Sequence, residues 1–268
     1  MPAFICATCG VQYAPADAPP DRCRICEDER QYLPPSGQHW TTLERLRRTH
    51  ANTWRRPEPG LFDIATAPAF AIGQRAFLVR TEAGNVLWDC LTLLDDATAD
   101  LVRALGGLAA IAISHPHYYG SMAEWAQAFD VPVWLHEADR AWVMRPDARL
   151  CFWSGPRHAL PGGLTLIHAP GHFDGGAMLH WPAGAGGQGA LLSGDIIQVA
   201  ADRATTGFMR SYPNWIPLGP SGVQRIADAV APFAFARVYG AFRDREILAD
   251  GKAAVARSVA RTLAWLAR

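Results

Sequence analysis

Four cysteines near the start of the chain are spaced for metal binding. They form two pairs, Cys6 with Cys9 and Cys23 with Cys26, and two residues separate the members of each pair. This spacing lets both sulfur atoms and the backbone N–H groups between them converge on one ion, and two such turns complete a tetrahedron. Four unrelated buried cysteines are the alternative, but paired turns of this kind rarely arise by accident. The spacing therefore predicts a four-thiolate metal site.

The segment that carries these cysteines, residues 1–32, resembles a zinc ribbon. Because so short a piece cannot bury a core of its own, we expect the metal to hold it together. Cys9-Gly10 together with Tyr13 also resembles rubredoxin, in which four thiolates hold iron for electron transfer. The softness and geometry of such a site suit both metals. The segment is too short for a complete rubredoxin, so zinc is our prediction and iron the alternative.

A second set of candidate ligands lies further along the chain. His115 and His117 directly follow one predicted strand, His172 lies in a Pro-Gly-His turn after another, and Asp195 lies in a Gly-Asp turn after a third. In an open α/β sheet, sites assemble at strand ends and in the loops after them. Three imidazoles and a carboxylate are a common ligand set for catalytic zinc or iron. We therefore predict a second metal site from these four residues.

The hydrophobic pattern predicts the elements that hold these ligands. Residues 108–114 form a continuous apolar run, which is typical of a strand buried on both faces. Ser121 and Glu124 form a capping-box pattern at the start of the helix that follows. Further strands are expected at 76–80, 86–89, 131–135, 163–168, 177–181, 190–192 and 235–239, and helices at 41–50, 98–105, 121–129, 138–143, 221–230 and 250–266. This mixture predicts an α/β fold.

The motifs, in this order, resemble the metallo-β-lactamase superfamily. His115-x-His117, Pro170-Gly171-His172 and Gly194-Asp195 carry the resemblance, which covers about residues 62–268. Local matches at Leu87-Trp88-Asp89, 133–137 and 168–172 support it. The resemblance implies an αββα sandwich, with the site at one edge, preceded by the small zinc ribbon. It also implies that the three histidines form the first metal site and that Asp195 is the bridging carboxylate.

The chain departs from the family pattern at the second metal site. The family motif continues His-x-His-x-Asp-His, and here the last two positions are Tyr119 and Gly120. The family's late histidine corresponds to Tyr239, so only the shared Asp195 remains. We therefore expect a mononuclear centre in the body.

A hydrolytic centre with one metal also needs a base close to the attacking water. Tyrosine is a poor base near neutral pH because its reference pKa is near 10. Asp195 and Asp174 are the candidate catalytic carboxylates, and Asp174 comes directly after the His172 turn. The alternative for Asp174 is a turn residue before two glycines.

Aromatic residues cluster close to the predicted ligands and predict a substrate pocket. The alternative is that they pack an irregular loop onto the body. The candidate pocket residues are Tyr118, Tyr119, Tyr212, Trp215 and Tyr239.

Composition limits the class of protein. The 268 residues are 50% hydrophobic, and Lys+Arg and Asp+Glu balance at 25 each. Without a global basic field, nucleic acid is not an expected partner. No secretory signal and no apolar run of about 18 residues is apparent, so we expect a cytoplasmic protein that does not enter a membrane. The predicted organisation is the four-cysteine module at 1–32, a linker with a short helix at 33–61, and the body at 62–268.

Three functions remain open at this stage. The first is a metal-dependent hydrolase acting on an ester, a thioester or an amide-like bond of an unidentified small molecule. The second is a non-catalytic zinc-binding protein in which the N-terminal module contacts a protein partner or a second copy of the chain. The third is an iron redox protein. The retained histidines favour the first function, although the family supports many chemistries on one fold.

Overall fold

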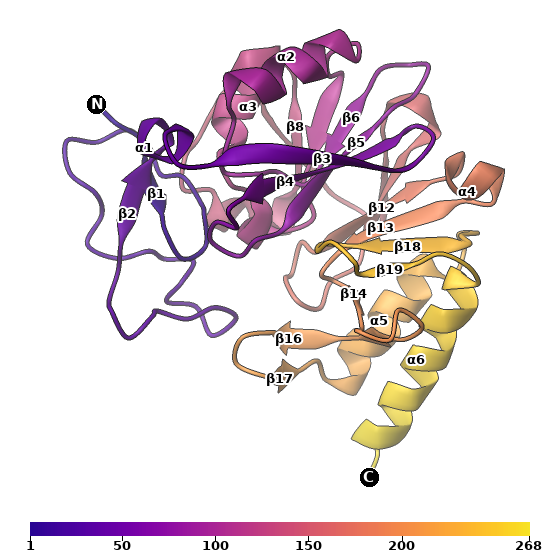
Figure 1. The fold of residues 1–268 in the computed structure, drawn as a ribbon. Coiled ribbons are helices and arrows are strands. Elements are labelled where there is room, and N and C mark those ends of the chain that lie inside the picture. Colours follow the sequence, from indigo (N-terminus) through magenta and orange to yellow (C-terminus); the bar gives the residue numbers. More distant parts are fainter.

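Two β-sheets lie face to face at the centre of the molecule (Figure 1). The structure is a computed structural model that describes all residues, 1–268. The first sheet has the strand order β3-β4-β5-β6-β7-β8-β9: β3 (Ala51–Glu58), β4 (Leu61–Ala67), β5 (Arg75–Val79), β6 (Val86–Trp88), β7 (Ala110–Ala112), β8 (Val133–His136) and β9 (Leu150–Trp153). The second has the order β10-β11-β12-β13-β18-β19: β10 (Arg157–Ala159), β11 (Thr165–His168), β12 (Ala177–Trp181), β13 (Ala190–Gly194), β18 (Arg237–Gly240) and β19 (Glu246–Ile247).

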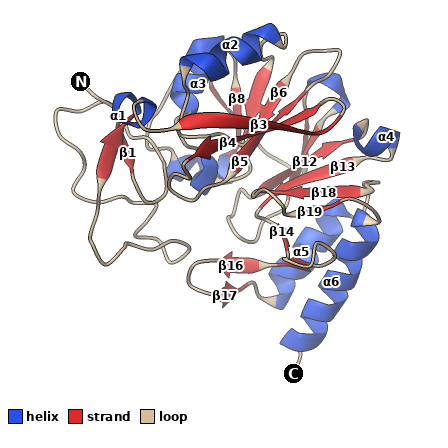
Figure 2. Cartoon of the chain, in the orientation of Figure 1, coloured by secondary structure: helices blue, strands red, loops and turns tan.

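Helices cover the outer faces of both sheets (Figure 2). Helices α2 (Asp96–Ala104) and α3 (Met122–Phe129) pack on the first sheet, and α5 (Pro220–Val230) and α6 (Gly251–Leu266) pack on the second. The predicted αββα sandwich is therefore confirmed. The shorter helices are α1 (Leu43–Arg47), α4 (Gly184–Gly187) and the 3-10 turns η1 (Pro116–Tyr118), η2 (Glu137–Trp142) and η3 (Pro161–Gly163).

Alternation along the strands builds the layers. In β6, Val86 and Trp88 point into the core between the sheets, whereas Leu87 points towards α3. In β13, Leu192 faces the inter-sheet core and Leu191 faces the α5 and α6 layer. Both of these strands are buried on both faces, which explains why the sequence has continuous apolar runs at these positions.

The start of α3 differs from the prediction. The expected capping box of Ser121 and Glu124 is wrong, because the Ser121 side chain makes no cap hydrogen bond. Its hydroxyl instead donates to the Thr92 carbonyl at 2.8 Å, and Glu124 pairs with Arg145 at 2.6 Å. Both side chains therefore bond to residues elsewhere in the fold and do not cap the helix.

The N-terminal cysteines belong to a small unit that is closed by a two-stranded sheet. Strand β1 (Phe4–Cys6) pairs antiparallel with β2 (Trp40–Thr42), so we call residues 1–42 the four-cysteine module. The segment 33–61, expected as a linker with a short helix, contains β2, α1 and β3, and β3 is the edge strand of the first sheet.

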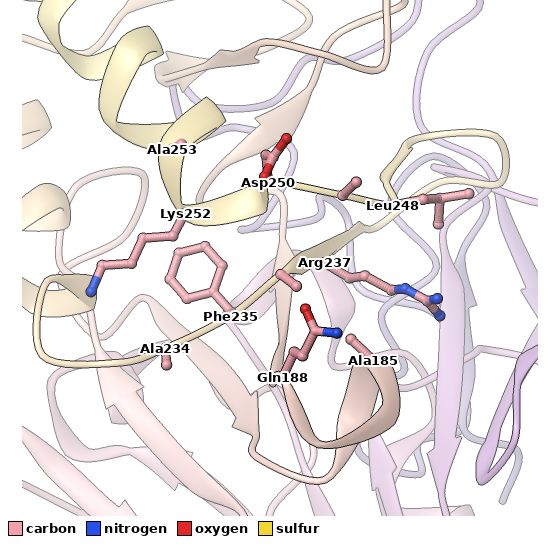
Figure 3. A pocket seen from close by; sticks show the side chains of 11 residues that line it. Ala185, Gln188, Ala234, Phe235, Arg237, Leu248, Asp250, Lys252 and Ala253 are labelled. Carbon is pink, nitrogen blue, oxygen red and sulfur yellow. The ribbon is translucent and has the colours of Figure 1, made fainter.

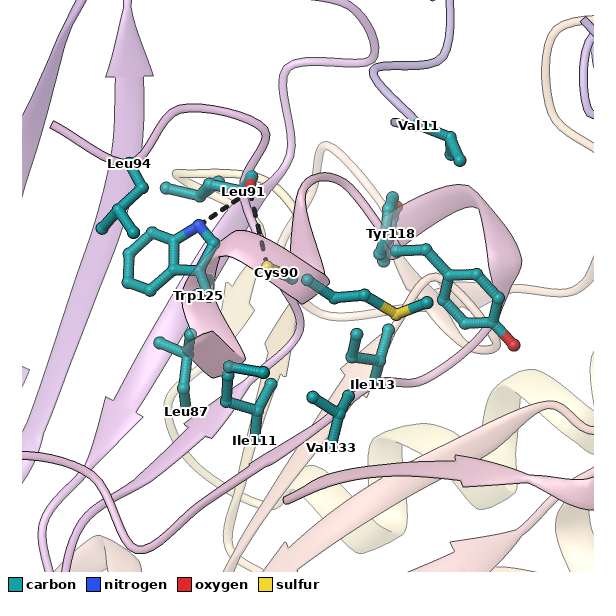
Figure 4. Packing of buried hydrophobic residues seen from close by; sticks show 14 of the residues in the cluster. Val11, Leu87, Cys90, Leu91, Leu94, Ile111, Ile113, Tyr118, Trp125 and Val133 are labelled. Atoms are coloured by element: carbon teal, nitrogen blue, oxygen red, sulfur yellow. Dashed lines mark hydrogen bonds between the residues drawn. The ribbon is translucent and has the colours of Figure 1, made fainter. Parts of the chain in front are cut away.

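The four-cysteine module and the body share one hydrophobic cluster. Cys6, Cys9 and Val11 belong to the same buried cluster as Tyr118 and Trp125 of the body. Figure 4 shows part of this cluster, with Val11 drawn together with body residues. The module is therefore packed onto the sandwich and does not stand apart from it.

Two small hairpins follow β13. Strand β14 (Gln198–Val199) pairs with β15 (Thr206–Gly207), and β16 (Met209–Ser211) pairs with β17 (Ile216–Pro217). The β16–β17 hairpin lies on the side of the body that faces the four-cysteine module (Figure 1). No helix of the structure is both long enough and apolar enough to cross a membrane.

Candidate metal centres

The histidine centre is assembled from the ends of three strands. His117 lies in turn η1, which follows β7, and His115 lies just before that turn. His172 follows β11, and Asp195 follows β13 directly. The side chains meet although they are far apart in the sequence, and the exposed fractions of the three histidines and Asp195 are 1%, 3%, 1% and 5%.

The donor atoms of the three histidines converge. One nitrogen of each imidazole lies within 4.8 Å of the others, and His172 Nε2 is 3.3 Å from His117 Nδ1. Asp195 Oδ1 lies 3.2 Å from His115 Nε2 and 4.0 Å from His172 Nε2. In a tetrahedral zinc site with bonds of about 2.0–2.1 Å, ligand nitrogens are about 3.3 Å apart. The spacing fits one small cation.

Hydrogen bonds on the far side of the imidazoles orient two of them. His172 Nδ1 lies 3.2 Å from the Met209 carbonyl, which can only accept, so Nδ1 carries the proton and Nε2 offers a lone pair to the centre. His115 Nδ1 lies 2.9 Å from the Ser114 hydroxyl. Apart from their close approach to each other, His115 Nε2 and Asp195 Oδ1 are buried without a hydrogen-bond partner. Buried polar atoms rarely lack a partner, and a cation bound here would supply one.

The electrostatics of the centre suit a cation. Burial lowers the pKa of His115, His117 and His172, so the imidazoles are neutral, as metal ligands must be. Burial raises the pKa of Asp195, and His172 and the Tyr118 hydroxyl partly oppose that rise. A cation would favour the ionised carboxylate in the same way.

Asp89, which the sequence placed at the end of a strand motif, supports the histidine centre. Its Oδ1 accepts a hydrogen bond from the Ser114 N–H at 2.8 Å, which fixes the residue before His115. Its backbone has a φ of 59°, an uncommon conformation for a residue other than glycine. Burial raises the pKa of Asp89 to about 7. A carboxylate directly after the apolar strand Val86–Trp88 was the available signal.

The four cysteines form a separate centre. Cys6 Sγ lies 3.6 Å from Cys26 Sγ, Cys9 Sγ lies 3.6 Å from Cys23 Sγ, and all four sulfur atoms lie within 4.8 Å of one another. Tetrahedral thiolates with bonds of about 2.3 Å lie about 3.8 Å apart, so the cluster fits one ion.

Two side chains donate to the sulfur atoms of this centre. The Tyr13 hydroxyl lies 3.4 Å from Cys23 Sγ, and Gln38 Nε2 lies 3.3 Å from Cys6 Sγ. Such donors stabilise thiolates over thiols. Of the two, Gln38 is a contact that the sequence did not reveal.

A sequence model of the metallo-beta-lactamase superfamily matches residues 71–236. The chain belongs to the metallo-beta-lactamase superfamily. It is also 53% identical over 244 residues to the "Uncharacterized protein YmaE" of Bacillus subtilis (strain 168), and the match covers 90% of this chain and 89% of that protein.

Solved structures of the superfamily share the fold. The DIM-1 metallo-beta-lactamase superposes with a TM-score of 0.60 at 13% identity, covering 81% of this chain and 98% of that chain. The Cronobacter sakazakii (Enterobacter sakazakii) metallo-beta-lactamase with a HARLDQ motif gives a TM-score of 0.52 at 18% identity, covering 80% and 92%. At these identities the likeness establishes the fold alone.

Two of the predicted pocket residues of this metallo-beta-lactamase superfamily member lie at the histidine centre. The Tyr118 ring lies 4.4 Å from the His115 ring, and the Tyr212 ring lies 5.6 Å from that of His172. The Tyr212 hydroxyl donates to the Asp195 backbone carbonyl at 2.7 Å.

The structure places the other candidate residues elsewhere. Tyr239 lies in the inter-sheet core, where its hydroxyl donates to Glu58 Oε1 at 3.0 Å. Trp215 is 82% exposed at the tip of the β16–β17 hairpin. The Asp174 side chain is exposed, and its backbone carbonyl accepts a hydrogen bond from His168 at 2.8 Å.

Two of the three positions that carry second-site ligands in the family pattern lie beside the four-cysteine module. Tyr119 is buried in the cluster that includes Val11. Gly120 has a φ of 48°, and a Cβ there would lie 2.8 Å from the Leu91 backbone. Its carbonyl accepts a hydrogen bond from the Gln12 N–H at 2.9 Å. Residues at these two positions therefore hold the module.

A surface hollow of about 580 Å³ lies beside the start of α6 (Figure 3). Phe235, Arg237, Leu248, Asp250 and Lys252 are among the residues that line it. No residue of either metal centre lines this hollow, so we place the chemistry at the buried histidines.

Proposed function

We propose that the protein is a metal-dependent hydrolase with a single catalytic ion, zinc, held by His115, His117 and His172 with Asp195 beside it, which leaves a fourth position for water. The observation that carries the proposal is the convergence of three neutral imidazoles, with Asp195 Oδ1 3.2 Å from His115 Nε2 and 4.0 Å from His172 Nε2. We further propose that the substrate has an ester, thioester or amide-like bond and that the four-cysteine module holds a second, structural zinc.

A zinc ion bound here would polarise a carbonyl group and lower the pKa of water. The protein's own groups set the rest of the chemistry. The Met209 carbonyl fixes the tautomer of His172, and Asp195 is the carboxylate within reach of the ligands. The exposed Asp174 is placed less well for a base. We therefore assign the proton-handling role to Asp195.

The surroundings support a mononuclear centre. Tyr119 and Gly120 contact the four-cysteine module, and Tyr239 bonds Glu58 in the core. Beyond Tyr239, the strand continues with Gly240, which pairs with Gly194, and neither offers a ligand side chain. A second ion would share Asp195 and lack its own histidine and aspartate.

Elemental analysis of protein purified without added metal tests the proposal. We expect about two zinc ions per chain in the wild type and about one in a Cys6→Ala/Cys9→Ala variant. The loaded protein should then hydrolyse a member of a panel of chromogenic esters, thioesters and lactams, and His117→Ala should abolish that activity. Three ions per chain, or two in the cysteine variant, would contradict the mononuclear centre.

The burial of the histidine centre also favours a second candidate, a non-catalytic zinc protein. In that case the wild type holds one ion and the cysteine variant none, and no substrate is turned over. The third candidate, an iron redox protein, predicts a coloured preparation, because iron–thiolate centres absorb visible light.

A further inference from the structure

An aromatic side chain packs against the three ligands of the histidine centre. Phe173 is itself 1% exposed, and its ring centroid lies 5.3, 4.8 and 5.2 Å from those of His115, His117 and His172. Ligands that are only 1–3% exposed are closed to a substrate from solution, and Phe173 packs against all three of them. Some part of the structure must therefore move before the centre can act on a molecule from solution.

A buried arginine from the four-cysteine module holds Phe173 from outside. The Arg30 guanidinium lies 3.9 Å from the centroid of the Phe173 ring and 5.0 Å from that of Trp142. Asp28 accepts two hydrogen bonds from the same guanidinium, one of them at 2.9 Å. Cation–π contacts strengthen when the charge and the ring are shielded from water. Arg30 thus contacts two aromatic rings of the body while Asp28 neutralises its charge.

The β16–β17 hairpin fastens the backbone on both sides of Arg30. Asn214 Nδ2 donates to the carbonyls of Glu29 and Gln31, both at 2.8 Å, and the Ser211 hydroxyl donates to that of Arg30 at 3.2 Å. Arg210 of this hairpin pairs with Glu29 at 2.9 Å. The same hairpin supplies the Met209 carbonyl that orients His172. The hairpin therefore connects the module to the ligands.

We propose that residues Asp28–Gln31, the cover segment, close the histidine centre, and that Arg30 is the positioning residue that holds it shut through Phe173. The cover segment begins two residues after Cys26, so the metal in the cysteine centre fixes its starting point. The state of one centre thereby controls access to the other. This inference rests on the proposed metal site at the histidines and does not depend on hydrolysis.

The rate of metal release tests the cover segment. The full chain is loaded with cobalt(II), and release to a chromogenic chelator is followed while thiolate-to-cobalt absorption reports the cysteine centre separately. We expect Arg30→Ala to speed release from the histidine centre at least tenfold without loss of the thiolate absorption. Arg30→Lys should give an intermediate rate, because lysine lacks the planar group that contacts both rings.

Arg22→Ala is the matched control. Arg22 lies in the same module and forms an exposed ion pair with Glu27, so its removal should leave the release rate unchanged. Asn214→Ala loosens the cover segment from the hairpin side and should also speed release, which keeps the test available if Arg30→Ala does not fold. Equal release rates in the wild type, Arg30→Lys and Asn214→Ala would overturn the proposal.

A second readout does not require metal at the histidines. In protein that keeps its metal at the cysteines and has an empty histidine centre, diethyl pyrocarbonate should modify His117 and His172 faster in Arg30→Lys and Asn214→Ala than in the wild type or Arg22→Ala, as measured by peptide mass spectrometry. If the wild type binds no cobalt at the histidines but the variants show this faster modification, the metal site fails and the cover segment stands. If cobalt binds and neither release nor modification changes, the cover segment fails alone.

Discussion

At the scale of residues, the same side-chain type has different roles depending on its neighbours. Tyr118 and Tyr212 contact the histidine centre, whereas Tyr239 is a core residue with a satisfied hydroxyl. Tyr119 takes a position that carries a ligand in the family pattern and contacts the four-cysteine module. Function at this scale is set by what each hydroxyl and ring touches.

Replacing His117 should remove the metal from one centre and leave it in the other. We expect His117→Ala to lose the ion of the body and to keep the ion of the cysteines, because the two centres share no ligand residue. Metal content per chain measures this directly, and His50→Ala is the control, since His50 lies outside both centres. Unchanged total metal in His117→Ala would count against the assignment.

Tyr239→Phe should affect stability and spare the metal. The hydroxyl bonds the buried Glu58 carboxylate, which also accepts bonds from Arg237 and the Ala185 N–H. We expect a loss of about 1.5 kcal/mol in the free energy of unfolding, as is typical for one hydrogen bond to a charged group. Urea denaturation measures the loss. A changed metal content in this variant would place Tyr239 nearer to the centre than the structure does.

At the scale of elements, two strand ends are joined by stacked histidines. His136 ends β8 in the first sheet and His168 ends β11 in the second, with ring centroids 3.8 Å apart and planes 13° from parallel. His136 Nδ1 accepts a hydrogen bond from the Ala138 N–H, so the ring is the neutral form. Burial, and then the neighbouring His168, lower the pKa of His136 to about 4.

This stack predicts a loss of stability in mild acid. Because the folded-state pKa lies below the unfolded value of about 6.5, the contribution is complete above pH 6.5 and falls as the pH drops towards 4. With an allowance for solvent screening, we expect protonation of His136 to lower the free energy of unfolding by about 1 kcal/mol between pH 7 and pH 5. Urea midpoints at both pH values should differ less in His136→Phe than in the wild type. Equal differences would refute the assignment.

At the scale of the whole molecule, the four-cysteine module is part of the architecture of the body. Thr92 Oγ1 donates to the Gly10 carbonyl at 2.8 Å, and the Ala14 N–H donates to the Met144 carbonyl at 3.1 Å. Together with the cover segment, these contacts bring the module against the loops that surround the histidine centre. One metal centre thus supports the surroundings of the other.

Removing the metal from the cysteine centre should loosen the module first. In a Cys6→Ser/Cys9→Ser variant, we expect residues 4–42, which include the cover segment, to lose amide protection. The reason is that metal binding supplies much of the folding energy of such small units. Strands β11, β12 and β13 should stay protected, since they lie in the two clusters of the second sheet. Hydrogen exchange with mass spectrometry measures both regions. Uniform loss of protection would show that the module and the sandwich unfold as one unit.

The sequence alone determined the ligand types and the order of the motifs, and the family resemblance of those motifs implied the αββα sandwich. Ligand spacing and hydrophobic alternation are local patterns, so Cys6-x2-Cys9, His115-x-His117 and the central strands of both sheets were predictable within a few residues. The mostly polar edge strand β3 was not predicted, because its pattern, with only Glu58 fully buried, lacks an apolar face.

Only the tertiary structure decided what surrounds the ligands. Three contacts join residues that are far apart in the chain. They are the cation–π contact of Arg30 with Phe173, the hydrogen bond from Tyr239 to Glu58, and the hydrogen bond from the Gln12 N–H to the Gly120 carbonyl. No local pattern encodes such contacts, because each depends on how two separately folded segments pack. The sequence therefore predicted the metal ligands, and only the fold placed Arg30 of the N-terminal module against Phe173 beside them.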